Sequence, residues 1–180
     1  IETWMPLPDY INSRMRGPHW PRQFRDRLAL RQSGPGQELL RRALETNDLK
    51  LLRRCARYHQ FSPAGAVALK CLSEIYLEKG DSLLASRWLF ELGLTHPEEF
   101  RKDPRLWVLC VRAFREADVR YDLDKTLRDF ERAAKDASID IGGQKTNALA
   151  YARALAAQAA PGERPELRKP GWFSMGGDAS

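Results

Sequence analysis

The chain has three cysteines, and their surroundings decide what chemistry they could perform. Cys55, Cys71 and Cys110 each stand among Leu, Ala and Val at helical spacing, and no C-x-x-C pair occurs. An odd count without such a pair is typical of buried free thiols rather than of a metal site or a redox pair. The histidines are isolated from one another and from any cysteine pair, so the sequence predicts no metal site. They are His19, His59 and His96.

Residues 141–146, IGGQKT, superficially resemble a phosphate-binding loop. Such a loop needs G-x-x-x-x-G-K-[ST], in which the lysine directly follows the second glycine. Here Gln144 separates Gly143 from Lys145, and the earlier glycine is missing. We therefore interpret this stretch as part of a short extended segment with a Gly-Gly β-turn, which leads into the last helix.

Paired carboxylates are the remaining candidates for chemistry. Glu98-Glu99 and the pair Glu116 and Asp118 lie near expected helix ends, where carboxylates cap a helix or face water. No Cys or His is placed beside an evident base or orienting partner. The sequence therefore predicts a protein that is not an enzyme, with no catalytic residue, no cofactor, no metal and no small-molecule substrate.

Length and composition are those of one soluble domain. The 180 residues are 43% hydrophobic and 30% charged, and a chain of this length can bury a core of its own. No run of 18 apolar residues occurs, so we expect no transmembrane segment. The first residue is Ile1 rather than Met, which indicates a processed chain or a piece of a longer one, and no signal peptide is visible.

The net charge of +6 raises the question of a polyanionic partner. The chain has 22 Arg and 8 Lys, and the densest block lies at residues 14–31, with Trp20 and Phe24 inside it. Aromatic and basic residues together can form a stacking platform for single-stranded nucleic acid. Because acids are interleaved with the basic residues, we interpret the block as a solvated face around buried aromatics. We do not expect nucleic acid as the partner, and an RNA- or polyanion-binding function is kept as an alternative.

Helical periodicity dominates from Gln37 onward. We expect three parts: an irregular segment at 1–35 with short helices near 9–15 and 21–31, a helical domain at 36–160, and a linker and tail at 161–180. Predicted caps and turns divide the domain into successive hairpins. They are Asn47-Asp48, Ser62-Pro63, Gly80-Asp81, Asp103-Pro104 and the region around Asp118.

The hairpin turns recur at a regular distance. Asn47-Asp48, Gly80-Asp81 and the Asp118 turn stand 33 and 37–38 residues apart, which is the period of helix–turn–helix repeats. The middle unit resembles a tetratricopeptide repeat when Ala66 is taken as its first position. Large residues then fill the helix seam, Ser73 and Ala85 occupy its small positions, and Gly80 forms the turn. The expected packing residues are Leu69, Leu72, Ser73, Tyr76, Gly80, Ala85, Leu89, Leu92 and Pro97. The predicted fold is therefore all-α, a tetratricopeptide-like α-solenoid of helical hairpins.

The last residues, PGWFSMGGDAS, break with this pattern. Trp172, then Gly176-Gly177-Asp178, follow the order in which blades of pyrroloquinoline-quinone-type β-propellers commonly begin. In such a blade the tryptophan packs between blades and the glycines allow a tight strand entry. The tail therefore resembles the start of a propeller blade.

The order of blocks along the chain extends this resemblance from about Pro6 to the end. It rests on PLPDYINSRM, residues 45–81, SLLASRWLFELGLTHP and IDIGGQKTNALAYA. Together they resemble a bacterial family in which a tetratricopeptide-like helical region precedes a pyrroloquinoline-quinone-type β-propeller. That propeller is related to the one in the outer-membrane-protein assembly lipoprotein. The resemblance implies an adaptor role for the helices and a cell-envelope setting, in the periplasm.

These observations favour a non-catalytic protein–protein interaction scaffold, or an assembly subunit of a larger bacterial envelope complex. The alternative from another class is a helper domain of a quinone-dependent dehydrogenase whose catalytic propeller lies outside this chain. The partner expected is another protein subunit or a propeller of the same polypeptide. Both termini lack enough helical pattern to order alone, so we expect them to dock on that neighbour. The partner-binding candidates are Trp4, Tyr10, Trp20, Trp172 and Phe173.

Overall fold

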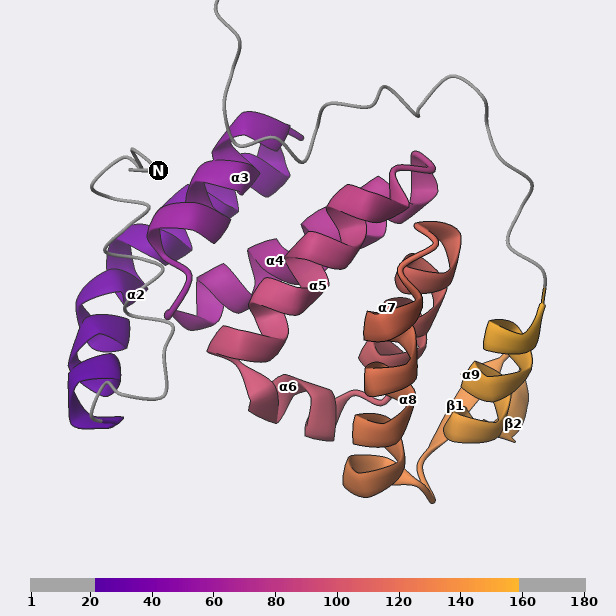
Figure 1. Ribbon diagram of the computed structural model, residues 1–180. Coiled ribbons are helices and arrows are strands. Elements are labelled where there is room, and N and C mark those ends of the chain that lie inside the picture. Colours follow the sequence, from indigo (N-terminus) through magenta and orange to yellow (C-terminus); the bar gives the residue numbers. More distant parts are fainter. Residues whose placement is uncertain (1–21, 159–180) are drawn as a thin grey trace, which may run out of the picture.

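The computed structural model describes residues 22–158, which form a predominantly helical domain. Figure 1 shows the helices lying side by side, from α2 and α3 at one end through α4, α5 and α7 to α9 at the other. A single hairpin of two antiparallel strands interrupts them. The helices are α2 (Arg22–Glu45), α3 (Leu49–Tyr58), α4 (Pro63–Glu78), α5 (Ser82–Thr95), α6 (Pro97–Lys102), α7 (Arg105–Glu116), α8 (Arg120–Ala134) and α9 (Ala148–Ala157). The strands are β1 (Ser138–Ile141) and β2 (Gln144–Asn147).

Three of the expected helix starts are confirmed, at Asp48, Ser62 and Asp81. The Asp48 carboxylate accepts hydrogen bonds from the backbone N–H groups of Lys50 and Leu51 at the start of α3. Ser62 caps α4 by accepting from the Gly65 N–H at 3.1 Å, with Pro63 in the first turn, and Asp81 caps α5. Each cap satisfies a backbone donor that the helix itself leaves unpaired. At the fourth expected start, Asp103 accepts from the Arg105 N–H at 3.1 Å, but Pro104 occupies the N-cap position of α7 and no described side chain caps the helix there.

Three turns between consecutive helices share one backbone geometry. Asn47, Gly80 and Asp118 all have positive φ, at 50°, 73° and 56°. After each of them the next N–H reaches back five residues to a helix carbonyl: Asp48 to Ala43, Asp81 to Tyr76 and Val119 to Phe114, at 3.0, 2.8 and 2.9 Å. Together with the shorter bond from the left-handed residue itself, this is the Schellman motif that ends many helices. The α2–α3, α4–α5 and α7–α8 hairpins therefore turn in the same way.

The first helix departs from the expectation. A short helix at 21–31 and an irregular boundary near residue 35 were predicted, but α2 runs unbroken from Arg22 to Glu45 through Gly34, Pro35 and Gly36. A proline inside a helix loses one backbone hydrogen bond and crowds the preceding turn. The helix nevertheless continues here, where its Gly36 is buried against His59 and Ser62.

Glycines allow α2 and α4 to approach the loop between α3 and α4 closely. A Cβ on Gly36 would lie 3.0 Å from Ser62 Oγ, and one on Gly65 would lie 2.1 Å from the His59 carbonyl oxygen. The Cys55 thiol fills the space between, near the carbonyl oxygens of Gly36 and Ala64 at 3.5 and 3.8 Å. A junction this tight has no room for an added side-chain atom.

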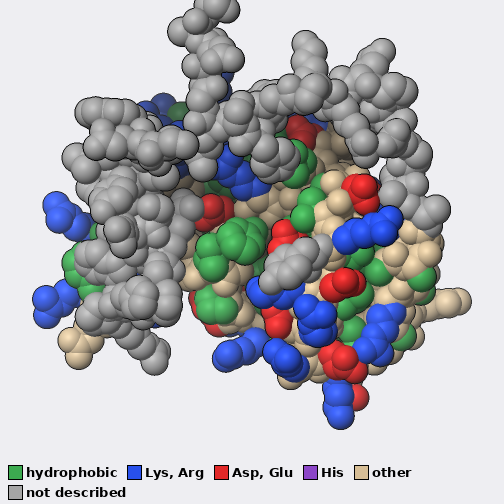
Figure 2. Space-filling view, in the orientation of Figure 1, with side chains coloured by type: hydrophobic (Ala, Val, Ile, Leu, Met, Phe, Trp, Pro, Cys, Tyr) green, Lys and Arg blue, Asp and Glu red, His purple; other side chains and the backbone are tan. Residues whose placement is uncertain are grey.

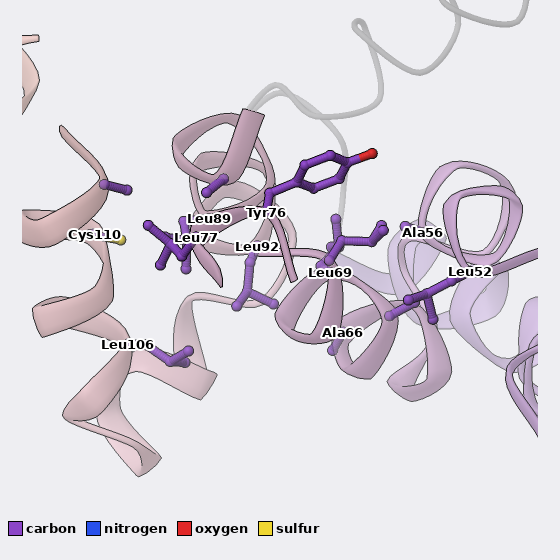
Figure 3. Close-up of a cluster of buried hydrophobic side chains, with 14 of the residues drawn as sticks. Leu52, Ala56, Ala66, Leu69, Tyr76, Leu77, Leu89, Leu92, Leu106 and Cys110 are labelled. Carbon is purple, nitrogen blue, oxygen red and sulfur yellow. The ribbon is translucent and has the colours of Figure 1, made fainter. Parts of the chain in front are cut away.

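The main core is a continuous row of side chains that joins α3 to α7. Figure 3 shows Leu52, Leu69, Leu89 and Leu106 in this row, with the Tyr76 ring at one side and its hydroxyl directed away from the leucines. The seam between α4 and α5 lies within it. Seven of the residues predicted to pack there are at most 5% exposed: Leu69, Leu72, Ser73, Tyr76, Ala85, Leu89 and Leu92. The packing prediction is wrong for Gly80 and Pro97, which are exposed, because Gly80 lies in the turn after α4 and Pro97 starts α6 beyond the end of α5. Residues 63–97 are described throughout and contain no strand, as the helical prediction required.

A second, smaller core joins α7, α8, α9 and the β-hairpin around Phe130 and Val111. The predicted Gly-Gly turn is confirmed, because Gly142 and Gly143 both have positive φ and Ile141 pairs with Gln144. A two-residue loop with positive φ at both positions matches the twist of an antiparallel hairpin. The hairpin then delivers Asn147, whose side chain caps α9.

Enlarging Ala85 should overpack the α4–α5 seam. Ala85 is fully buried, so we expect Ala85→Trp to lower the free energy of unfolding by about 1–3 kcal/mol or more. Leu83→Trp is the matched control, because Leu83 is 49% exposed on the same helix. Urea unfolding of both variants measures the difference, and an unchanged midpoint for Ala85→Trp would show that the seam has spare room.

Two glycine substitutions should have opposite effects on stability. Gly65→Ala would force a methyl group into the His59 carbonyl, so we expect a loss of at least about 1–3 kcal/mol. Gly34→Ala meets nothing within 4 Å and should stabilise α2 by about 0.5–1 kcal/mol, because alanine loses less backbone entropy in a helix. The thermal unfolding midpoints of both variants test these expectations. An unchanged midpoint for Gly65→Ala would contradict the close approach of α4 to the His59 carbonyl.

Candidate protein-binding groove

The partner-binding residues expected from the sequence lie outside the described residues. They are Trp4, Tyr10, Trp20, Trp172 and Phe173. The candidate site of the described domain is instead a groove between α5 and α8, which we call the α5–α8 groove. It has a volume of about 360 Å³. The residues that line it are Leu89, Phe90, Gly93, Leu94, Pro97, Phe100, Arg101, Trp107, Cys110, Phe114, Asp122, Lys125, Thr126, Asp129 and Ala133.

The α5 wall of the groove carries large apolar side chains that remain open to solvent. Phe90 is 52% exposed and Leu94 is 39% exposed. Both lie on the side of α5 away from Leu89 and Leu92, which are fully buried in the core. Figure 2 shows hydrophobic side chains gathered over α5, beside the charged side chains of α8. Helix α5 therefore buries one apolar face in the core and leaves a second apolar face open to solvent, where it can contact a partner.

Aromatic rings build the floor of the groove. The Trp107 ring meets the edge of Phe100 at a centroid distance of 4.9 Å and stacks on Phe130 at 5.4 Å with an angle of 9° between the planes. Its indole N–H donates to the Phe100 carbonyl oxygen at 3.1 Å. These contacts fix the indole from three sides, so the floor is rigid and its polar atom is already satisfied.

Helix α6 closes one end of the groove and is held in place from two directions. Pro97 starts α6, and the buried Phe100 anchors it to α7. On its other side, Glu99 accepts from the Lys70 ammonium of α4 at 2.5 Å and from Lys102 at 3.0 Å. The Lys70 hydrogen bond, helped by Lys102 and opposed by partial burial, holds the pKa of the Glu99 carboxyl below its ordinary value.

The α8 wall supplies the polar rim. Asp122, Lys125, Thr126 and Asp129 line this side, and Arg101 of α6 lines the other. Lys125 and Arg132 both reach Asp129, at 3.6 and 3.7 Å. Of the rim charges, Lys125 and Asp129 therefore pair with each other along α8, and the floor below them is apolar.

The Cys110 thiol at the groove and the Cys55 thiol in the core are both kept protonated by burial. Burial raises the pKa of the Cys110 thiol, which lines the groove, so at neutral pH it is a thiol and not a nucleophilic thiolate. Burial likewise raises the pKa of Cys55 to about 11. All three cysteines are free. Among residues 22–158, no group of three or more His, Cys, Asp and Glu side chains could hold a metal ion.

His96 is buried, and both of its ring nitrogens contact groups of the chain itself. His96 is 8% exposed between α5 and α6. Its Nε2 contacts the Gln60 carbonyl oxygen at 2.7 Å, and its Nδ1 lies 3.3 Å from Glu98. The ring therefore ties the end of α5 to the α3–α4 loop, and both nitrogens are engaged within the chain.

The groove itself was not identified from the sequence. The signal was present in SLLASRWLFELGLT, where Phe90 and Leu94 form an apolar stripe opposite Leu89 and Leu92. Sequence periodicity assigned the buried stripe correctly but could not tell which neighbour would leave the other stripe uncovered. Within the described part of the chain, no helix combines the length and apolarity needed to cross a bilayer.

No family model matches the chain, and searches of curated proteins and of solved structures find no match either.

The Glu99–Lys70 pair makes a prediction about pH. The carboxyl of Glu99 has a pKa of about 4.3 in the unfolded chain and a lower pKa in the folded one. As the pH falls, the unfolded state therefore takes up its proton first. The stability that the pair contributes is present above about pH 4.3 and is lost as the pH falls through the lower, folded pKa. Because the two side chains are 25% and 20% exposed, we expect Glu99→Gln to cost at most about 1 kcal/mol at neutral pH.

Urea unfolding across this pH range tests the prediction. The difference in unfolding free energy between the natural chain and Glu99→Gln should shrink toward zero in acid. Glu74→Gln, which removes an exposed carboxylate from α4, serves as the control. A difference that stays constant in acid, or one that Glu74→Gln reproduces, would contradict the role of the pair.

Proposed function

We propose that this chain is a non-catalytic scaffold or assembly subunit that binds a segment of another protein in the α5–α8 groove. The observation that carries the proposal is the apolar groove itself, with half-exposed Phe90 and Leu94 on one wall and the fixed Trp107 on its floor. Large rigid aromatic side chains around a desolvated pocket are the usual energetic centres of protein interfaces. The occupant is an apolar-faced segment whose polar side chains meet the charged rim of α8.

The shape of the groove favours a polypeptide over a small-molecule substrate. Its polar groups are at the rim, where Lys125 and Asp129 pair with each other, and its aromatic floor has its indole N–H already bonded to Phe100. Small-molecule sites instead direct a few polar groups inward to orient the ligand. An apolar floor between two helices with a polar rim is the arrangement that receives the apolar face of a helix.

The proposal includes a repeat architecture. Three hairpins with the same Schellman turn support it, as do the left-handed residues Asn47, Gly80 and Asp118 at spacings of 33 and 38 residues. Small buried residues at the α4–α5 seam, Ser73 and Ala85, also agree with a tetratricopeptide-like unit. In such a solenoid the groove lies between neighbouring units, where a partner contacts both.

The setting proposed for this function is the bacterial cell envelope, in the periplasm. Its support is the resemblance of the chain to helical regions that precede a pyrroloquinoline-quinone-type propeller. The partner is then a propeller of the same polypeptide or another subunit of the complex. The residues proposed to dock on it at the two ends of the chain are Trp4, Tyr10, Trp20, Trp172 and Phe173.

A phage-displayed library of random twelve-residue peptides tests the groove without knowledge of the natural partner. Peptides selected on the full chain should carry at least two large apolar residues, because the floor and the α5 wall offer only apolar contacts. Their binding should weaken at least about tenfold in Phe90→Asp. Fluorescence anisotropy measures the dissociation constants.

Leu44→Asp is the matched control, because Leu44 is 50% exposed on α2 and lies outside the groove. It introduces the same charge and should leave peptide binding within about twofold of the natural chain. Thermal unfolding first establishes that both variants are folded. Failure to select any peptide, or equal losses in both variants, would overturn the proposed function of the groove.

A further inference from the structure

The net positive charge of the chain comes from the segment that holds its first two described helices. Residues 22–60 contain ten Arg and Lys against four Asp and Glu, whereas residues 61–158 contain fifteen of each. The undescribed ends are balanced as well, with five basic and five acidic residues between them. The whole net charge of +6 therefore comes from the segment that forms α2, α3 and the start of the following loop.

Within this segment the charge is not evenly presented. On α2, Arg41 is held between two carboxylates, Glu38 at 2.8 Å and Glu45 at 2.6 Å. The charge of the Arg41 guanidinium is thereby compensated by the carboxylates of Glu38 and Glu45. Helix α3, in contrast, contains four basic residues and no acid. Since α2 has six Arg and three acids over 24 residues, the net positive charge per residue is higher in α3.

The basic residues of α3 form one face. Lys50, Arg53, Arg54 and Arg57 follow one another at intervals of three, one and three residues, which places them along one side of a helix. They are all exposed, and with Tyr58 they line a shallow cavity of about 400 Å³. Among the described residues, no carboxylate lines it. We call these five residues the α3 cationic face.

Part of this face is fixed in position by the core. The Arg53 guanidinium donates a hydrogen bond to the Tyr76 hydroxyl and lies over the Tyr76 ring, with its Cζ 5.5 Å from the ring centroid. Tyr76 itself is 5% exposed and belongs to the main core. An arginine held in this way loses less conformational entropy when it binds an anion.

We propose that the α3 cationic face is a second docking site, which binds an acidic helical segment of a partner protein. The proposal extends the scaffold function and rests on it only for the class of partner, a protein. The four cations span about 10 Å along the helix axis, from the rise of 1.5 Å per residue. Glutamates or aspartates at the same helical spacing on a facing helix meet them in register, and arginine pairs with a carboxylate through two parallel hydrogen bonds.

Two features favour an acidic protein segment over nucleic acid. The face contains one exposed aromatic residue, Tyr58 at 52%, whereas single-stranded nucleic acid is held by stacking on several aromatic rings along a basic groove. The α3 cationic face is also short, since its four cations span about 10 Å along the helix axis. A short face with three guanidinium groups fits a few carboxylates better than a tract of phosphates.

The test measures binding of a fluorescein-labelled helical peptide to the full chain by anisotropy. The peptide carries glutamates at positions one, four, five and eight of an alanine-rich helix. The same measurement is made with single-stranded poly(U) of equal charge and with phosphatidylserine vesicles. We expect Lys50→Glu/Arg54→Glu to weaken peptide binding at least about tenfold, because each substitution replaces an attraction with a repulsion.

The control is Arg87→Glu/Arg128→Glu, which changes the net charge by the same amount at exposed positions on α5 and α8. It should leave binding within about twofold. Lys50→Gln/Arg54→Gln, with its smaller change in charge, replaces the first variant if that one unfolds, and should weaken binding in the same direction. Phe90→Asp should leave this peptide's binding unchanged, so that failure here and failure of the groove proposal are separate results.

Three outcomes overturn the proposal. The first is no saturable binding of the peptide, and the second is equal weakening in the control pair. The third is tighter binding of poly(U) or of vesicles than of the peptide, lost in the same α3 variant, which would assign the face to nucleic acid or to a lipid surface. Tight, saturable peptide binding that depends on Lys50 and Arg54 supports it.

Discussion

A left-handed residue at three hairpin turns is the constraint from which the arrangement of this chain follows. At Asn47, Gly80 and Asp118 the backbone reverses through positive φ, and a hydrogen bond across five residues closes each turn. Two of these residues are not glycine, so their conformation carries a steric cost that the surrounding structure must offset. The carbonyl that each bond satisfies belongs to a buried residue of the preceding helix, which ties the turn directly to the core.

The groove is a consequence of how these hairpins stack. Helix α7 packs against both α5 and α8, and so it becomes the floor between them. The short helix α6 sets one end of the opening, because Phe100 fixes it to Trp107 and Glu99 fixes it to Lys70. The half-exposed Phe90 and Leu94 on α5 are the apolar surface that this arrangement leaves uncovered.

Local chemistry was readable from the sequence where a single residue decides a local conformation. Asp48, Ser62 and Asp81 cap their helices because a short polar side chain can reach the free N–H groups. The Gly142-Gly143 turn was readable for the same reason, since both positions need positive φ. Helix α2 was not readable, because its passage through Pro35 occurs where Gly36 packs against a loop more than twenty residues away.

For the two candidate binding surfaces, too, the sequence contained the residues, but their exposure and pairing depended on tertiary structure. The apolar stripe of Phe90 and Leu94 was present in the sequence, but only tertiary packing decides which stripe of α5 stays exposed. The charge of α3 was also present, but the sequence interpretation concentrated on the denser basic block at residues 14–31 and did not single out α3. The pairing of Arg41 with Glu38 and Glu45 is seen only in the structure, and it distinguishes this part of α2 from α3, which contains no acid.

The central claim is that the α5–α8 groove receives a polypeptide, and amide chemical shifts report this most directly. A peptide selected on the chain is titrated into the isotopically labelled protein while the backbone amides and the Trp107 indole N–H are followed. The account predicts that the largest shifts occur at Phe90, Gly93, Arg101 and Thr126 and at the Trp107 indole, with α2 and α3 unchanged. Shifts centred on α2 and α3, or spread evenly over the described domain with the indole unmoved, would contradict it.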